Sequence, residues 1–157
     1  FGVFMGMKAA AKYKYGSDDL EGKKVLVQGI GHVGESLVEH LSNEGATVLI
    51  SDINPARLEE VSRKYSAKIY TDDIYDADID IYAPCALGAT INNETISRLK
   101  AGIIAGAANN QLADENVHGK MLQDKGIVYA PDFLINAGGI INVYAALEGY
   151  DLSLITH

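Results

Sequence analysis

Three glycines at residues 29–34 have the spacing of a phosphate-binding turn. Gly29, Gly31 and Gly34 follow an apolar run that ends at Gln28. In such a turn the first glycine allows a tight bend, the second lets the backbone approach a pyrophosphate, and the third lets a helix pack closely on a strand. The start of that helix offers free N–H groups and a positive dipole end to the phosphates. The turn therefore predicts a dinucleotide site.

Asp52 lies eighteen residues after Gly34, where the strand that follows the helix is expected to end. A carboxylate there accepts hydrogen bonds from the adenosine ribose and repels a 2′-phosphate, so we expect NAD rather than NADP. Ile53 is expected beside the adenine, as an apolar contact to a flat ring. Arg57 keeps an alternative open, because a basic residue at this place could accommodate the 2′-phosphate of NADP.

The residues between the last two glycines are expected to bind the cofactor without doing chemistry. His32 would contribute its backbone and not its imidazole. Val33 would lie under the pyrophosphate turn in a packing role, on the helix face that also carries Leu37, Val38 and Leu41.

Apolar runs alternate with helical patterns along the chain. Strands are expected at residues 24–28, 47–51, 68–70, 79–83, 102–106 and 127–130. Helices are expected at residues 4–15, 32–44, 55–65, 93–99, 113–124 and 138–149. This alternation is typical of an α/β fold, here a Rossmann-type doubly wound, mostly parallel sheet with helices on both faces. In such sheets ligands bind outside the carboxyl ends of the strands.

The loop after the expected fourth strand begins with Cys85, the single cysteine of the chain. A nucleophilic thiol needs a lowered pKa and a neighbouring base. The sequence identifies no such base, so we expect Cys85 to pack or to line the cofactor site. Ala86, Leu87 and Gly88 follow, and small residues here let the backbone approach the ribose and the nicotinamide.

Asn136 precedes the run Ala137-Gly138-Gly139. Its side-chain amide could pair with the nicotinamide carboxamide, because each amide has both a donor and an acceptor. The alternative is that Asn136 caps the helix expected at 138–149. The sequence leaves both roles open.

The composition excludes several other kinds of protein. A net charge of −8 argues against nucleic acid and against an anionic membrane as partners. The acidic run 71–78 lacks the spacing and the glycine of a calcium loop, and His40, His118 and His157 form no pair at metal spacing, so no metal is expected. The single cysteine and the absence of an apolar run of about 20 residues fit a cytoplasmic protein.

Further blocks of sequence resemble the cofactor domain of the leucine dehydrogenases, members of the glutamate/leucine/phenylalanine/valine dehydrogenase superfamily. They are YAPCALGATIN at residues 82–92, AGAANNQL at 105–112, HGKMLQDKGIVYAPDFLINAGGIINV at 118–143 and GMKAAAK at 6–12. The resemblance implies a homo-oligomer that carries out reversible, NAD-dependent oxidative deamination of a branched-chain L-amino acid to its 2-oxo acid and ammonia. A valine or phenylalanine dehydrogenase is an alternative. A non-catalytic nucleotide-sensing domain, like the regulatory domains of potassium transport systems, is another.

The resemblance also implies roles for residues after the fifth and sixth strands. Asn109 would contact the cofactor, and Asn110 would reach the substrate or the nicotinamide ribose. The alternative is a pair of turn asparagines. Ile140 and Val143 would line the pocket for the substrate side chain, although an amphipathic helix packed on the sheet explains apolar residues there equally well.

The catalytic lysine of this superfamily lies in a separate amino-terminal substrate domain, in a Gly-Gly-Gly-Lys-type motif that this sequence does not contain. We therefore assign no catalytic residue to this chain. Residues 1–157 are expected to be one NAD(P)-binding domain, a fragment without the substrate domain and without the C-terminal helices. Such a fragment would bind NAD without turnover.

Overall fold

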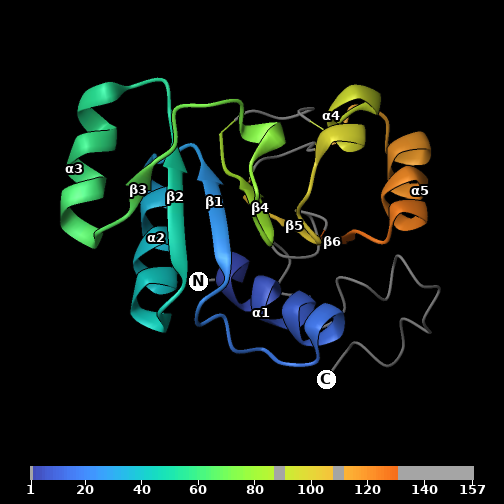
Figure 1. The fold of residues 1–157 in the computed structure, drawn as a ribbon, viewed down its shortest axis with the longest axis horizontal. Coiled ribbons are helices and arrows are strands. Elements are labelled where there is room, and N and C mark those ends of the chain that lie inside the picture. The colour runs from blue at the N-terminus through green and yellow to red at the C-terminus, as the bar shows by residue number, and fades with distance from the viewer. Residues whose placement is uncertain (1, 87–90, 108–111, 131–157) are drawn as a thin grey trace.

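The structure, a computed structural model, describes residues 2–86, 91–107 and 112–130. Six strands form one parallel sheet in the order β3-β2-β1-β4-β5-β6 (Figure 1). The strands are β1 Lys24–Gln28, β2 Thr47–Ser51, β3 Lys68–Ile69, β4 Ile81–Pro84, β5 Ile103–Ala105 and β6 Val128–Ala130. The strand order reverses at β1, which pairs with β2 on one side and with β4 on the other.

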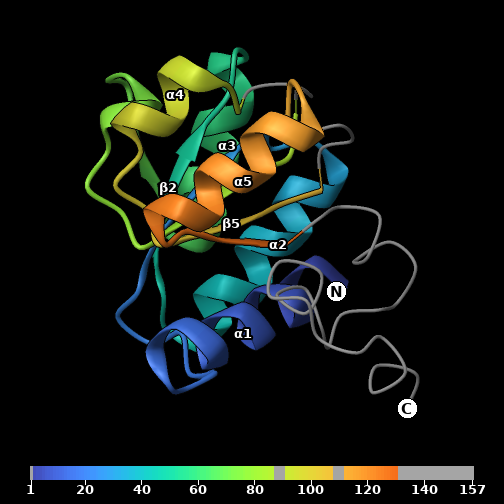
Figure 2. The same ribbon diagram turned by 90° about the vertical axis from the view of Figure 1, so that its right-hand side faces the viewer.

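Helices cover both faces of the sheet. They are α1 Gly2–Tyr15, α2 His32–Glu44, α3 Pro55–Tyr65, α4 Asn93–Arg98 and α5 Glu115–Lys125, with a 3₁₀ turn, η1, at Ile74–Asp76. Figure 2 shows α1 and α2 on one side of the sheet and α4 and α5 on the other. Within the described ranges, no helix is long and apolar enough to cross a membrane.

The two faces of β1 explain why the sheet needs helices on both sides. Val25 and Val27 pack into one buried cluster with residues of α1 and α2, while Leu26 belongs to a second cluster with residues of α4 and α5. Side chains alternate between the faces of a strand, so a continuous apolar run is buried on both. The predicted fold class is confirmed.

The buried face of α2 differs from the prediction by one residue. It consists of Gly34, Leu37, Val38 and Leu41. Val33 is 50% exposed, so it is not part of this buried face, and its contact with the pyrophosphate stays a prediction. One residue turns the helix by about 100°, which carries Val33 off the stripe that begins at Gly34.

The start of β4 also differs from the prediction of a strand at 79–83, because pairing begins two residues later, at Ile81. Asp80 lies just before it, and its carboxylate accepts a hydrogen bond from the backbone N–H of Lys24, at 2.8 Å. The Asp80 backbone also donates to the carbonyl oxygen of Lys24 and accepts the N–H of Gly102, both at 2.9 Å, so Asp80 joins the starts of β1, β4 and β5.

Helix α5 begins at Glu115, two residues later than predicted. Asp114 is its N-cap, and the Asp114 carboxylate accepts a hydrogen bond from the N–H of Asn116 at 3.0 Å. Aspartate is among the preferred N-cap residues, because it satisfies backbone donors of the first turn. The helix predicted at 138–149 lies outside the described residues.

Candidate functional site

The glycine turn connects β1 to α2 at the carboxyl edge of the sheet. Gly29 has a φ of 94°, a conformation that residues with a side chain rarely adopt. Its N–H donates to the carbonyl oxygen of Ser51 at 2.7 Å, which fixes the turn to the end of β2. A Cβ on Gly29 would lie 2.4 Å from the Cβ of Ala86, so the turn and the segment after β4 are in close contact.

Gly34 is closely packed, whereas Gly31 borders open space. A Cβ on Gly34 would lie 2.0 Å from the carbonyl oxygen of Gly29, so a side chain there would separate α2 from the turn. A Cβ on Gly31 would meet no described atom within 4 Å. Gly31 is the N-cap of α2 without a side-chain cap, and His32 and Val33 beside it are exposed. The start of α2 therefore presents its backbone N–H groups to open space, as phosphate binding requires.

Asp52 holds the turn from the end of β2. One carboxylate oxygen accepts the N–H of Ile30 at 2.8 Å, and the other accepts the N–H of Asn54 at 2.9 Å. Each carboxylate oxygen has a further lone pair, so Asp52 retains capacity to accept hydrogen bonds from a ligand. Asn54, not Asp52, caps α3, because the Asn54 side chain accepts the N–H of Arg57.

A pocket of about 200 Å³ lies beside this carboxylate. It is lined by Gln28, Gly29, Ser51, Asp52, Ile53 and Ala86. The side chain of Ile53 is fully exposed at its rim, which leaves an apolar surface for a flat ring. The structure thus brings together the ends of β1, β2 and β4, where the strand order reverses and where such sheets bind ligands.

Cys85 is a packing residue of this edge. Its backbone N–H donates to the carbonyl oxygen of Gln28 at 2.7 Å, and its Cβ lies 3.7 Å from where a Cβ of Gly34 would be. Burial raises the pKa of the Cys85 thiol to about 11. The thiol is therefore protonated at neutral pH, and a protonated thiol is a poor nucleophile.

A network of charged side chains from α2 and α3 holds the glycine turn through the carbonyl oxygen of Ile30. Its central residue, Glu35, is not identified by the sequence analysis. Arg57 donates from Nε to the carbonyl oxygen of Ile30 at 2.9 Å and from Nη2 to the Glu35 carboxylate. The same carboxylate accepts hydrogen bonds from the Tyr65 hydroxyl at 2.9 Å and from Lys64 Nζ at 3.1 Å. The Tyr65 hydrogen bond, with those of Arg57 and Lys64, lowers the pKa of Glu35 to about 2.

A second group that sequence analysis missed joins the segments after β4 and β5. His118 is buried, its Nδ1 accepts the N–H of Asp114 at 2.9 Å, and its Nε2 lies 2.7 Å from Asn93 Oδ1. Because Nδ1 accepts, the proton is on Nε2, which donates to Asn93. A parallel bridge between Ile91 and Leu112 joins the same two segments.

The structure does not describe most of the residues predicted to contact the nicotinamide and the substrate. Leu87, Asn109, Asn110, Asn136, Ile140 and Val143 are outside the described residues. Their roles stay predictions.

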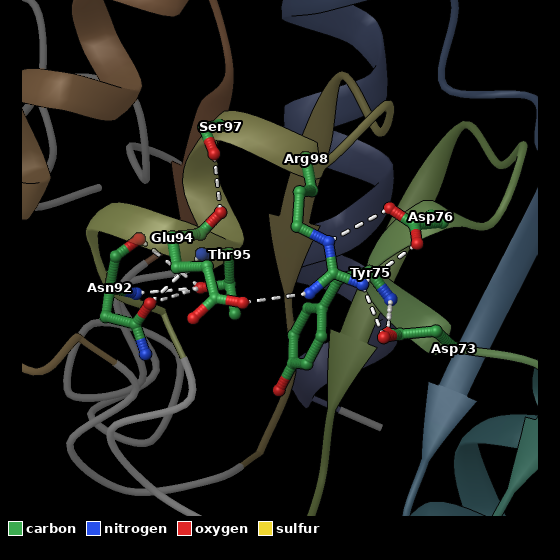
Figure 3. Close-up of polar contacts among 8 residues, drawn as sticks. All are labelled: Asp73, Tyr75, Asp76, Asn92, Glu94, Thr95, Ser97 and Arg98. Atoms are coloured by element: carbon green, nitrogen blue, oxygen red, sulfur yellow. Dashed lines mark hydrogen bonds and ion pairs between the residues drawn. The ribbon is translucent and has the colours of Figure 1, made fainter.

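The acidic run 71–78 anchors α4. Arg98 binds Asp76 with Nε at 3.0 Å and Nη2 at 2.9 Å, and it also pairs with Asp73 and Glu94 (Figure 3). These hydrogen bonds from Arg98 hold the pKa values of Asp73 and Asp76 below their ordinary range. In the part of the chain that the structure describes, no group of three His, Cys, Asp or Glu side chains could hold a metal ion.

The chain resembles known dehydrogenases along nearly its whole length. It is 57% identical to a leucine dehydrogenase of Thermoactinomyces intermedius over 152 residues, which is 96% of this chain and 41% of that protein. It is 45% identical to a phenylalanine dehydrogenase of Caldalkalibacillus thermarum, over 95% of this chain and 42% of that protein. It also matches a crystal structure of L-tryptophan dehydrogenase from Nostoc punctiforme, with a TM-score of 0.84 and 50% sequence identity. The match covers 98% of this chain and 46% of the tryptophan dehydrogenase chain.

Two family models match the sequence. The model of the TrkA-N domain matches residues 25–80, which hold the glycine turn and Asp52. The model described as glutamate/leucine/phenylalanine/valine dehydrogenase matches residues 54–150. The chain spans less than half the length of the relatives described above, yet those relatives match nearly all of it. The resemblance noted in the sequence is therefore confirmed: this chain belongs to the glutamate/leucine/phenylalanine/valine dehydrogenase family.

Proposed function

We propose that this chain is the NAD-binding domain of an amino acid dehydrogenase. The full-length protein would convert a branched-chain L-amino acid, with leucine as the first candidate, to its 2-oxo acid and ammonia while NAD is reduced. The observation that carries the proposal is the convergence of an uncapped helix start, the Asp52 carboxylate and the exposed Ile53 around one pocket. Membership of the family supports the reaction.

The described residues at this edge suit the adenosine and pyrophosphate parts of a dinucleotide. The space beside Gly31 and the N–H groups at the start of α2 suit a pyrophosphate. Asp52 would accept hydrogen bonds from the adenosine ribose, and Ile53 would contact the adenine. Cys85 and Ala86 would line the path towards the nicotinamide, which when bound supplies the acceptor for a hydride.

The remaining roles of the site belong to residues outside the described ranges. Leu87, Asn109 and Asn136 would complete the cofactor site, and Asn110, Ile140 and Val143 would face the substrate. The catalytic lysine would come from a part of the full-length protein outside this chain, so the chain alone would bind NAD without turnover. We further propose a cytoplasmic homo-oligomer, as is usual for such dehydrogenases.

The preferred amino acid substrate is less well defined than the reaction class, because the relatives are dehydrogenases of different amino acids. The leucine dehydrogenase relative favours an aliphatic substrate, whereas relatives named for phenylalanine and L-tryptophan make an aromatic one the alternative. One methylene in an apolar pocket changes the preference by only about 1–3 kcal/mol, so valine and isoleucine should also react. NADH formation by the full-length protein with a panel of L-amino acids separates the two classes.

The cofactor is tested by titrating NAD⁺ and NADP⁺ into the full-length protein, as wild type and as Asp52→Asn. The amide keeps one acceptor, for the N–H of Ile30, and removes the charge, while the N–H of Asn54 loses its acceptor. We expect wild type to prefer NAD⁺, and Asp52→Asn to bind NAD⁺ about tenfold more weakly because ribose hydrogen bonds to a charged acceptor are lost. Equal affinity of wild type for both cofactors would contradict the role given to Asp52.

A further inference from the structure

Arg57 lies within reach of the place where a 2′-phosphate would bind. It is in the first turn of α3, its backbone N–H donates to the Asn54 side chain, and the N–H of Asn54 donates to Asp52. Its guanidinium binds the carbonyl of Ile30, while the Asp52 carboxylate binds the N–H of the same residue. The carboxylate proposed for the ribose and the guanidinium therefore hold opposite ends of one residue.

Each of the three guanidinium nitrogens is nevertheless hydrogen-bonded to a group of this protein. Its Nε serves Ile30, its Nη2 serves Glu35, and its Nη1 lies 3.3 Å from Glu60. The side chains of Arg57 and Glu35 are only 26% and 18% exposed. Glu35 also binds Lys64, so a single carboxylate compensates two cations beside the adenosine end of the site.

We propose that Glu35 is a specificity-determining residue, which excludes NADP by retaining Arg57 in the network behind the glycine turn. The inference rests on the proposed cofactor site. A guanidinium recognises a phosphate through two parallel hydrogen bonds, so it contributes to binding only when its donors are free to turn towards the ligand. Asp52 repels a 2′-phosphate, and Glu35 keeps Arg57 from binding it.

This division of roles predicts that the two carboxylates act together on NADP binding. Removing the Asp52 charge alone ends the repulsion but leaves Arg57 bound to Glu35. Removing the Glu35 charge alone weakens the hold on Nη2 of Arg57 but leaves the repulsion. The gain in NADP affinity should therefore be larger for the double substitution than the product of the single gains, as groups in one network couple.

The experiment measures dissociation constants of NADP⁺ and NAD⁺ by calorimetric titration of the full-length protein. The variants are Asp52→Asn, Glu35→Gln, the double substitution, and the double substitution combined with Arg57→Met. We expect each single variant to gain less than about threefold in NADP⁺ affinity and the double variant to gain more than about tenfold. Adding Arg57→Met should abolish the gain, and salt should weaken it.

Glu39→Gln in the Asp52→Asn background is the matched control, because Glu39 is an exposed glutamate of the same helix. It should leave the NADP⁺ affinity unchanged. Glu35→Met is a second variant of similar size, expected to act in the same direction as Glu35→Gln. Thermal unfolding of each variant shows whether the fold is retained.

The inference is overturned if neither Glu35 substitution raises NADP⁺ affinity in the Asp52→Asn background, or if the gain survives Arg57→Met. NAD⁺ binding by wild type separates this failure from that of the proposed function. If wild type binds NAD⁺ and the double variant gains nothing, only the role of Glu35 is wrong. If wild type binds neither cofactor, the proposed function and this inference are both wrong.

Discussion

Gly31 and Gly34 belong to one turn, but a methyl group would have different effects at the two positions. At Gly34 it would meet the carbonyl oxygen of Gly29 at 2.0 Å, while at Gly31 it would point into open space. Gly34→Ala should therefore lower the free energy of unfolding by about 1–3 kcal/mol, the usual cost of overpacking. Chemical denaturation of both variants measures the difference.

Gly31→Ala is the informative partner of that variant. Gly31 has a φ of −67°, which alanine adopts without strain, so the free energy of unfolding should change by less than about 1 kcal/mol. NAD⁺ affinity should nevertheless fall at least about tenfold, because the methyl group occupies the space proposed for the pyrophosphate. Unchanged NAD⁺ binding by Gly31→Ala would show that the pyrophosphate lies elsewhere.

The Glu35 carboxylate should make the stability of the protein sensitive to acid. Its pKa is lowered to about 2 in the folded protein, chiefly by the Tyr65 hydroxyl and then by Arg57 and Lys64. A carboxyl with a depressed folded pKa stabilises the fold above its unfolded pKa, and this stabilisation is lost as the pH falls through about 4.5 towards 2. We expect Glu35→Gln to remove part of that loss, as denaturation midpoints across this pH range would show.

The sequence predicted the residues whose function follows from local spacing. One helix and one strand of standard length separate the glycine turn from Asp52, so the sequence alone predicts that they lie close together. Glu35 and His118 could not be assigned in this way. Their partners Arg57 and Asn93 lie 22 and 25 residues away, and only the packing of α2 on α3 and of α4 on α5 brings them together.

At the scale of elements, His118 links the start of α5 to the start of α4. It is buried and makes hydrogen bonds to both Asp114 and Asn93. His118→Leu leaves the Asn93 amide and the Asp114 N–H without this partner, so the free energy of unfolding should fall by about 1–3 kcal/mol. Chemical denaturation of the variant measures the change.

Asn93→Ala, alone and combined with His118→Leu, completes a double-mutant cycle. If the link is real, the double variant should lose less stability than the sum of the single losses. Additive losses would mean that His118 and Asn93 act independently.

The ends of the elements were harder to predict than their existence. Strands and helices within residues 2–130 were placed correctly by their apolar periodicity, because the buried clusters impose that periodicity. The start of β4 differs from the prediction at Asp80, whose hydrogen bonds to Lys24 and Gly102 join neighbouring strand starts and are not revealed by the local sequence. The sequence shows that the acidic run 71–78 is not a calcium loop, but its partner Arg98 is identified only by the packing of α4 against η1.

At the scale of the whole molecule, the proposed cofactor site is assembled from β1, β2 and the end of β4, which β3 separates from the first two in the sequence. Residues of β1, β2 and the segment after β4 line one pocket, so a bound cofactor should hold the centre of the sheet together. NAD⁺ at one hundred times its dissociation constant should raise the free energy of unfolding of the full-length protein by about 2.7 kcal/mol. Thermal unfolding with and without NAD⁺ measures the effect.

The same concentration of NADP⁺ should stabilise the wild-type protein much less. Gly31→Ala supplies the second comparison, because it should lose the stabilisation by NAD⁺ while retaining its own unfolding temperature. Stabilisation of wild type by both cofactors to the same extent would be inconsistent with a carboxylate that repels the 2′-phosphate.

The position of α1 has a consequence for how the chain folds during its synthesis. This helix comes before β1 in the sequence, yet it packs against β5 and β6, with Met7 fully buried, as Figure 1 shows beneath these strands. The part of its apolar face that β5 and β6 cover therefore stays exposed until residues near Val128 have left the ribosome. At about 5–20 residues per second, that interval is on the order of ten seconds, during which a chaperone could bind the helix.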